Sequence, residues 1–131
     1  MLIRATHENL TKVNELVEEY LADKMISFKT RSQIDLAVEE IYINIASYAY
    51  PDSEGNAEII LSENNGELVM TFIDEGVPYD PLAKPDPDTT LSASERQIGG
   101  LGIFLVKKIM DSVTYKYEDG KNILTISKKL A

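Results

Sequence analysis

The chain has 131 residues and a formal net charge of −9, with no Cys, no Trp and a single His. This length is typical of one domain with its own core, here residues 1–131, and the composition excludes disulfide scaffolds, thiolate zinc sites, cysteine nucleophiles and multi-histidine metal sites. The acidic excess disfavours nucleic acid as a partner, and the lack of a signal peptide or of an apolar run of ~20 residues leads us to expect a cytoplasmic protein without membrane spans.

The first half of the sequence predicts a short strand and two helices. Residues 2–6 form an apolar strand, and apolar residues at helical spacing predict an amphipathic helix over residues 8–22. A Thr-x-x-Gln pattern that starts at Thr30 is typical of a capping box, so we expect a second helix to begin there and to end before Pro51. This helix is apolar around most of its circumference, which predicts a central position in the fold.

The second half predicts two hairpins, separated by an irregular segment and a helix. Asn-Gly lies between the strands predicted within residues 58–73, and Asp-Gly between those within residues 113–127. Between the hairpins, residues 74–98 hold four of the five prolines and indicate a lid or binding loop, with a disordered linker as the alternative; a helix follows over about residues 100–111. Strands close in sequence and helices collected elsewhere predict an α+β fold, with a mostly antiparallel sheet and helices on one face.

Glu40 and Asn44 form the first of three clusters that carry polar chemistry. They lie four residues apart, so they share one face of the second predicted helix, beside apolar neighbours. A buried carboxylate costs several kcal/mol (roughly) unless a partner compensates it, so a buried pair requires a partner. The alternative is a solvated pair beside a buried stripe.

Asp74 and Gly76 form the second cluster, at the end of an apolar strand. A carboxylate there can accept a hydrogen bond from an amino group such as N6 of adenine, and glycine permits a close backbone approach. Asp-x-Gly is also common in ordinary turns, which is the alternative interpretation.

Glycines at the start of the third predicted helix form the third cluster. The free N–H groups of a first helical turn attract anions, and glycine lets a phosphate come close. Tight packing of the helix entry is the alternative, but each glycine costs about 1 kcal/mol of helix propensity, so several need a reason. The pattern is neither a P-loop nor a Rossmann fingerprint. Its members are Gly99, Gly100, Leu101 and Gly102.

The order and spacing of the three clusters resemble the N, G1 and G2 boxes of the GHKL ATPase superfamily, which includes gyrase B, Hsp90, histidine kinases and MutL. Residues 37–40 with Asn44, and residues 74–76, are similar to the stand-alone anti-sigma factor serine/threonine kinases of bacteria. The resemblance covers nearly the whole chain. It implies a Bergerat-type two-layer α/β sandwich with a lid over about residues 75–98.

The resemblance also implies roles for the residues of the first two boxes in binding ATP. Asn44 would give its amide oxygen to Mg²⁺, and Glu40, rather than Glu39, would be the general base toward an acceptor hydroxyl or a water. Asp74 would bind N6 of adenine, and Gly76 would let the base lie close.

The sequence departs from the family pattern at the residues expected to bind the phosphates, in the lid and beside the adenine site. Gly99, Gly100, Leu101 and Gly102 would cradle the phosphates at a helix N-terminus. Arg96, the candidate for the γ-phosphate, lies four residues before Gly100 rather than two or three. Asn122 stands where relatives carry a threonine that supports the adenine-binding aspartate, and Tyr48 stands where many carry histidine.

The activity implied by the resemblance is that of an anti-sigma factor and protein serine/threonine kinase. Such a protein binds a sigma factor and phosphorylates a STAS-type antagonist, and the family implies a homodimer through the N-terminal strand and first helix. The alternative is a module that binds ATP or ADP and switches its partner surface without significant transfer. A third possibility is a protein of this fold that binds no nucleotide. It would require the three motifs to occur in this order by coincidence.

Overall fold

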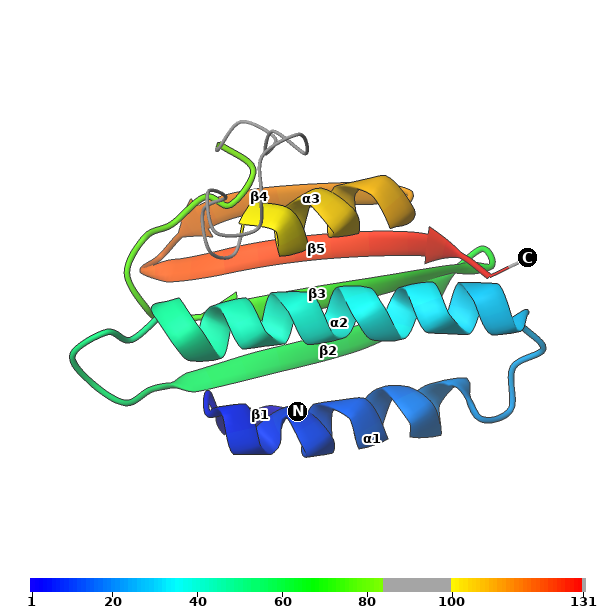
Figure 1. The fold of residues 1–131 in the computed structure, drawn as a ribbon, viewed down its shortest axis with the longest axis horizontal. Helices are drawn as coiled ribbons and strands as arrows, with labels where there is room; N and C mark the ends of the chain where they lie inside the picture. Colours follow the sequence, from blue (N-terminus) through cyan, green and yellow to red (C-terminus); the bar gives the residue numbers. More distant parts are fainter. Residues whose placement is uncertain (84–99, 131) are drawn as a thin grey trace.

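The computed structural model describes residues 1–83 and 100–130, which form a sheet with helices on one face (Figure 1). A 3₁₀ turn precedes the first helix, and the remaining elements follow the predicted order. The bounds are β1 Leu2–Arg4, the 3₁₀ turn His7–Asn9, α1 Leu10–Leu21, α2 Phe28–Tyr48, β2 Asn56–Asn64, β3 Glu67–Asp74, α3 Gly100–Ile109, β4 Ser112–Glu118 and β5 Lys121–Lys129.

The five strands of the described residues form one antiparallel sheet in the order β1-β2-β3-β5-β4. Side chains alternate along each strand, so β3 buries Leu68, Met70 and Phe72 beneath the helices. On that face α2 lies between α1 and α3 (Figure 1). The predicted α+β, two-layer fold is therefore confirmed. No helix within residues 1–83 and 100–130 is long and apolar enough to cross a membrane.

The central helix α2 begins earlier than the sequence predicts. Ser27 has an extended backbone and caps the helix, because its Oγ accepts a hydrogen bond from the Thr30 N–H at 3.1 Å. The predicted start at Thr30 is therefore wrong. The predicted central position is confirmed, but Leu36 remains 37% exposed, so only one side of the helix is buried. That side consists of Ile34, Ala37, Val38, Ile41, Tyr42 and Ile45.

Both predicted hairpins form, and each turns through two residues with positive φ. The φ values are 53° and 78° at Asn65 and Gly66, and 54° and 76° at Asp119 and Gly120. Two successive positive values define the type I′ turn, which Asn-Gly and Asp-Gly adopt with little strain. The turns set the register of β2 with β3 and of β4 with β5. The separate pairing of β3 with β5 places Asp74, the last residue of β3, opposite Asn122.

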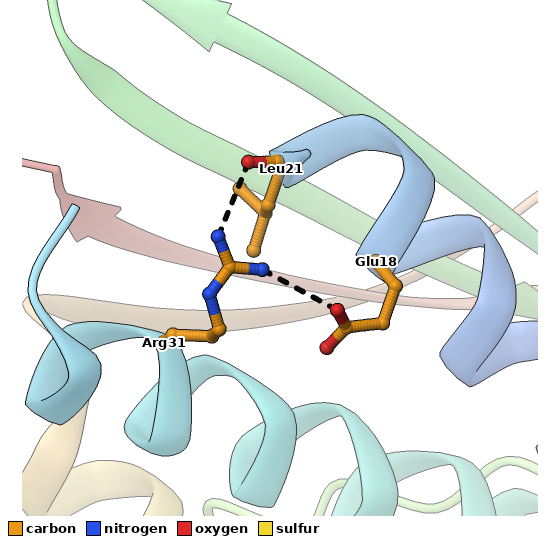
Figure 2. Close-up of polar contacts among 3 residues, drawn as sticks. All are labelled: Glu18, Leu21 and Arg31. Atoms are coloured by element: carbon orange, nitrogen blue, oxygen red, sulfur yellow. Dashed lines mark hydrogen bonds and ion pairs between the residues drawn. The ribbon is translucent and has the colours of Figure 1, made fainter. Parts of the chain in front are cut away.

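Arg31 joins α1 to α2 (Figure 2). Its Nη1 lies 3.4 Å from Oε2 of Glu18, and its Nη2 donates to the carbonyl of Leu21 at 3.3 Å. The carbonyls of the last helical turn have no partner within the helix, and the Leu21 carbonyl accepts from the Lys24 N–H at 3.1 Å and from this guanidinium. The ion pair is partly solvated and contributes at most about 1 kcal/mol, so the contact chiefly orients α1 on α2.

Asp35, one turn after Arg31, carries a carboxylate that the fold disfavours. Burial raises its pKa, Glu18 and Glu39 raise it further, and Arg31 opposes them. A raised pKa means that the folded state holds the proton more tightly than the unfolded chain. Ionised Asp35 therefore lowers stability above its folded-state pKa, and this cost disappears below the ordinary aspartate range, about pH 4.

We therefore expect Asp35→Asn to raise the melting temperature at pH 7 and to have no stabilising effect under acid conditions. The gain is below about 1 kcal/mol, because the carboxylate is still partly solvated. Thermal unfolding measured across this pH range tests the expectation, with Asp52→Asn in an exposed loop as the matched control. An Asp35→Asn protein that melts no higher than the parent at pH 7 contradicts it.

Candidate functional site

A pocket opens between the C-terminal half of α2 and the adjacent end of the sheet. It encloses about 420 Å³ of empty space, counted with its open mouth, and most of its lining is apolar or aromatic. Three of the predicted binding residues, Asn44, Asp74 and Asn122, line it together although they come from α2, β3 and β5. The remaining lining residues are Ile41, Ile45, Ala49, Phe72, Tyr79, Pro81, Tyr115 and Leu124.

Asp74 is the buried acceptor of this pocket. It ends β3, is only 7% exposed, and its Oδ1 accepts hydrogen bonds from the Gly76 N–H and from Asn122 Nδ2, both at 2.9 Å. Burial raises the pKa of Asp74, and these two hydrogen bonds oppose that shift. Both bonds end on Oδ1, so within the described part of the chain Oδ2 is left for a donor from outside.

Asn122 is the second buried polar residue, directly opposite Asp74 in the β3–β5 register. Its Nδ2 donates to Asp74 and, at 2.9 Å, to the carbonyl of Val77. Its Oδ1 accepts from the Tyr79 N–H at 3.2 Å and from the Tyr115 hydroxyl. Asn122, which was expected to support Asp74, thus also forms hydrogen bonds with the backbone at the start of the predicted lid.

Gly76 lies against the C-terminal end of α2. A Cβ at this position would stand 2.2 Å from the carbonyl oxygen of Ala49, a backbone atom that has no room to move aside. The Val77 N–H also donates to that carbonyl at 2.9 Å. The structure therefore assigns glycine at position 76 a packing role between β3 and α2, which the Asp-x-Gly pattern does not reveal.

Glu40 reaches from α2 to the first turn of α3. A Cβ at Gly102 would stand 2.3 Å from Oε2 of Glu40, so the carboxylate lies directly against this turn. Glu40 is half-buried, whereas Glu39 is exposed, which distinguishes the two adjacent carboxylates. A carboxylate at a helix N-terminus is favoured by the open N–H groups and the helix dipole.

The rest of the predicted phosphate site is covered only in part. Gly100 and Leu101 lie in the first turn of α3, as predicted, together with Gly102. Arg96 and Gly99, and the predicted lid beyond residue 83, lie outside the described residues. Their roles remain predictions.

The roles of two tyrosines in and beside the pocket were not predicted from the sequence. Tyr115 lines the pocket and binds Asn122, while the Tyr50 hydroxyl accepts from the Glu75 N–H at 2.8 Å and donates to the Asn56 carbonyl at 2.6 Å. The hairpin register could have revealed Tyr115, because an Asp-Gly turn places it on the same face as Asn122 and diagonally across, opposite Leu124. Tyr50 belongs to the Ala49-Tyr50 pair that the family resemblance includes, but its hydrogen bonds were not predicted.

Few side chains in the described part of the site could act as metal ligands. Within the described ranges, no group of three or more His, Cys, Asp and Glu residues gathers around one point. Mg²⁺ usually takes one or two protein oxygens, with phosphates and waters as its other ligands. The Asn44 amide in the pocket fits such a site, because it adds an oxygen ligand without adding charge.

Comparison with known proteins gives consistent results. The family profile of the histidine kinase-like ATPase domain matches residues 3–128. The serine/threonine-protein kinase BtrW of Bordetella bronchiseptica is 29% identical over 102 residues, covering 77% of this chain and 72% of that protein. The anti-sigma F factor of Clostridium acetobutylicum is 22% identical over 128 residues, covering 98% and 88%. The crystal structure of the RsbU and RsbW domains of Rv1364c from Mycobacterium tuberculosis shares the fold, with a TM-score of 0.64, 14% identity, and coverage of 99% of this chain and 32% of that chain.

Proposed function

This chain belongs to the histidine kinase-like ATPase domain family, and on that premise we propose that it is an ATP- and Mg²⁺-dependent protein serine/threonine kinase. The family relationship supports ATP as the nucleotide. The finer assignment rests on the relatives named as serine kinases and on the arrangement of Glu40 at the start of α3.

The contact between Glu40 and the first turn of α3 is the observation that carries the proposal. The N–H groups of that turn are suited to hold the phosphates of ATP, so the Glu40 carboxylate stands where a hydroxyl approaching the γ-phosphate would arrive. Glu40 takes the hydroxyl proton as the oxygen forms its bond to the γ-phosphorus. The bond to the β-phosphate oxygen breaks and ADP leaves. Such transfer depends mainly on positioning and charge neutralisation.

Binding of the base and the metal is assigned to the pocket. Asp74 accepts from the 6-amino group of adenine through Oδ2, and the apolar lining covers the faces of the ring. Asn44 gives its amide oxygen to Mg²⁺, which neutralises phosphate charge. Arg96, Gly99, Gly100, Leu101 and Gly102 complete the phosphate site in this proposal.

The proposed partners follow from the relatives. One relative is named an anti-sigma F factor, so we assign a sigma factor as one partner and a STAS-type antagonist, bearing the acceptor hydroxyl, as the substrate. Residues 1–131 act as one ATPase domain whose lid spans about residues 75–98, and the reaction takes place in the cytoplasm of a bacterium. The protein is a homodimer formed through β1 and α1.

A nucleotide-gated binding module is the second candidate, and one observation favours it. Asn122 binds both Asp74 in the pocket and the backbone at Val77 and Tyr79, where the predicted lid starts. A base that binds Asp74 would therefore also affect Asn122, the side chain that holds the start of the predicted lid. This coupling requires no phosphate transfer.

Phosphate transfer distinguishes the two candidates. The pure protein is incubated with Mg²⁺ and γ-labelled ATP in a lysate of its source, with and without the added protein. A small labelled protein that appears only with the added protein establishes a kinase and identifies its substrate. If calorimetry detects ATP binding but no protein is labelled, the binding module is correct. Calorimetry without heat up to millimolar ATP excludes both.

A further inference from the structure

The side-chain amide of Asn122 is held in one orientation by its hydrogen-bond partners. Its Oδ1 receives the Tyr79 N–H and the Tyr115 hydroxyl. Its Nδ2 faces the acceptors Asp74 Oδ1 and the Val77 carbonyl, with the Gly76 carbonyl farther away at 3.5 Å. If the amide rotated by half a turn, its NH₂ group would face the two donors and its oxygen would face the acceptors, so these hydrogen bonds would be lost. A buried amide that is fully paired in this way strongly resists rotation.

Tyr115 is the side-chain member of the pair of donors that face Oδ1. It lies on β4 opposite Leu124, two residues along the ladder from Asn122 and on the same face, and its hydroxyl is the atom of the tyrosine that reaches the amide. The other donor, the Tyr79 N–H, is a backbone group on the segment after β3, at 3.2 Å. Removing the Tyr115 hydroxyl thus leaves Oδ1 with one donor in place of two.

We propose that Tyr115 determines base selectivity, because its hydroxyl fixes the Asn122 amide so that Asp74 is presented to the base as an acceptor. The proposal rests on the nucleotide binding proposed above. Tyr115 acts through Asn122 and is a positioning residue; among the described residues it has no hydrogen bond to Asp74 itself.

The selectivity follows from the donors and acceptors of the two purines. An ionised carboxylate only accepts, so it binds the 6-amino group of adenine and repels the 6-oxo group of guanine. An Asn122 amide that lacks the Tyr115 hydroxyl holds Asp74 less firmly, because Asp74 Oδ1 accepts from Asn122 Nδ2. A carboxylate that can turn presents Oδ2 to the base less often, so adenine loses part of its hydrogen bond and guanine part of its repulsion. The preference for adenine over guanine therefore weakens.

The test compares the full chain with Tyr115→Phe, using calorimetric Kd values for Mg·ATP and Mg·GTP. Loss of one neutral hydrogen bond predicts a fall of about three- to tenfold in the ratio of ATP affinity to GTP affinity. Tyr117→Phe is the matched control, because Tyr117 lies on the same face of β4 and is 48% exposed. Its ratio should equal that of the parent.

The outcomes separate this inference from the proposed function. Equal losses of ATP and GTP affinity in Tyr115→Phe, or no change in either, overturn the role of Tyr115 and leave nucleotide binding intact. A parent protein that binds neither nucleotide overturns the proposed function and this inference with it. A measurement without nucleotide adds a second check: the Asn122 amide protons should exchange with solvent faster in Tyr115→Phe, and an unchanged rate overturns the inference.

Discussion

Replacing Glu40 by Gln should abolish most phosphate transfer while leaving ATP affinity nearly unchanged. The substitution keeps the size of the side chain and its place against Gly102, but glutamine cannot take the proton of the acceptor hydroxyl. General-base catalysis contributes about 10²- to 10⁴-fold, so we expect a loss of that order in the transfer rate. Transfer to the partner identified by labelling and calorimetric ATP affinity, measured on the same preparations, provide the two values.

Glu39→Gln is the control for the same charge change on the same helix. Glu39 is exposed and adjacent in sequence, so its substitution should leave both transfer and affinity near the parental values. A Glu40→Gln protein that transfers phosphate at the parental rate shows that Glu40 is not the base. Loss of transfer in Glu39→Gln alone would assign that role to the neighbouring carboxylate.

Replacing Asp74 by Asn should weaken ATP binding strongly and at the same time stabilise the fold. The asparagine oxygen can still accept from the Gly76 N–H and Asn122, but its NH₂ group takes the place of the acceptor left for the base. A hydrogen bond to a charged group contributes about 1.5–3 kcal/mol, which corresponds to a loss in ATP affinity on the order of 10- to 100-fold.

The stabilisation follows from the raised pKa of Asp74, which burial causes. Because the folded state holds the proton more tightly than the unfolded chain, ionised Asp74 destabilises the fold at neutral pH, and this cost disappears as the pH falls below the ordinary aspartate range. The Asp74→Asn protein should therefore melt higher than the parent at pH 7 and lose this advantage in acid. Opposite changes in stability and binding are typical of a residue retained for function.

Calorimetry with Mg·ATP and thermal unfolding test both parts of this prediction on one variant. Glu75→Gln, next in sequence and exposed, is the matched control and should change neither value. Parental ATP affinity in Asp74→Asn would show that the carboxylate does not bind the base. A large fall in melting temperature would show instead that the ionised group holds the strand end in place.

The local elements of this protein could be predicted from sequence because each rests on residues close together in the chain. Asn65-Gly66 and Asp119-Gly120 accept the positive φ values that close the two hairpins. Helical periodicity marked the first helix, and a capping pattern with an apolar run marked the second. The start of α2 was misplaced, because the choice between Ser27 and Thr30 as its cap depends on a single backbone conformation. The boxes were recognisable because their residue types and order suffice for a resemblance.

The contacts within the site were decided by the tertiary structure alone. Glu40 meets Gly102 because α2 and α3 pack side by side, and Gly76 meets the Ala49 carbonyl because β3 ends against α2. Asn122 binds Asp74, 48 residues away in sequence, through the pairing of β3 with β5. Sequence by itself thus determined which residue types and local elements are present. Which polar atoms meet was set by strand register and helix packing, because these bring together residues far apart in the chain.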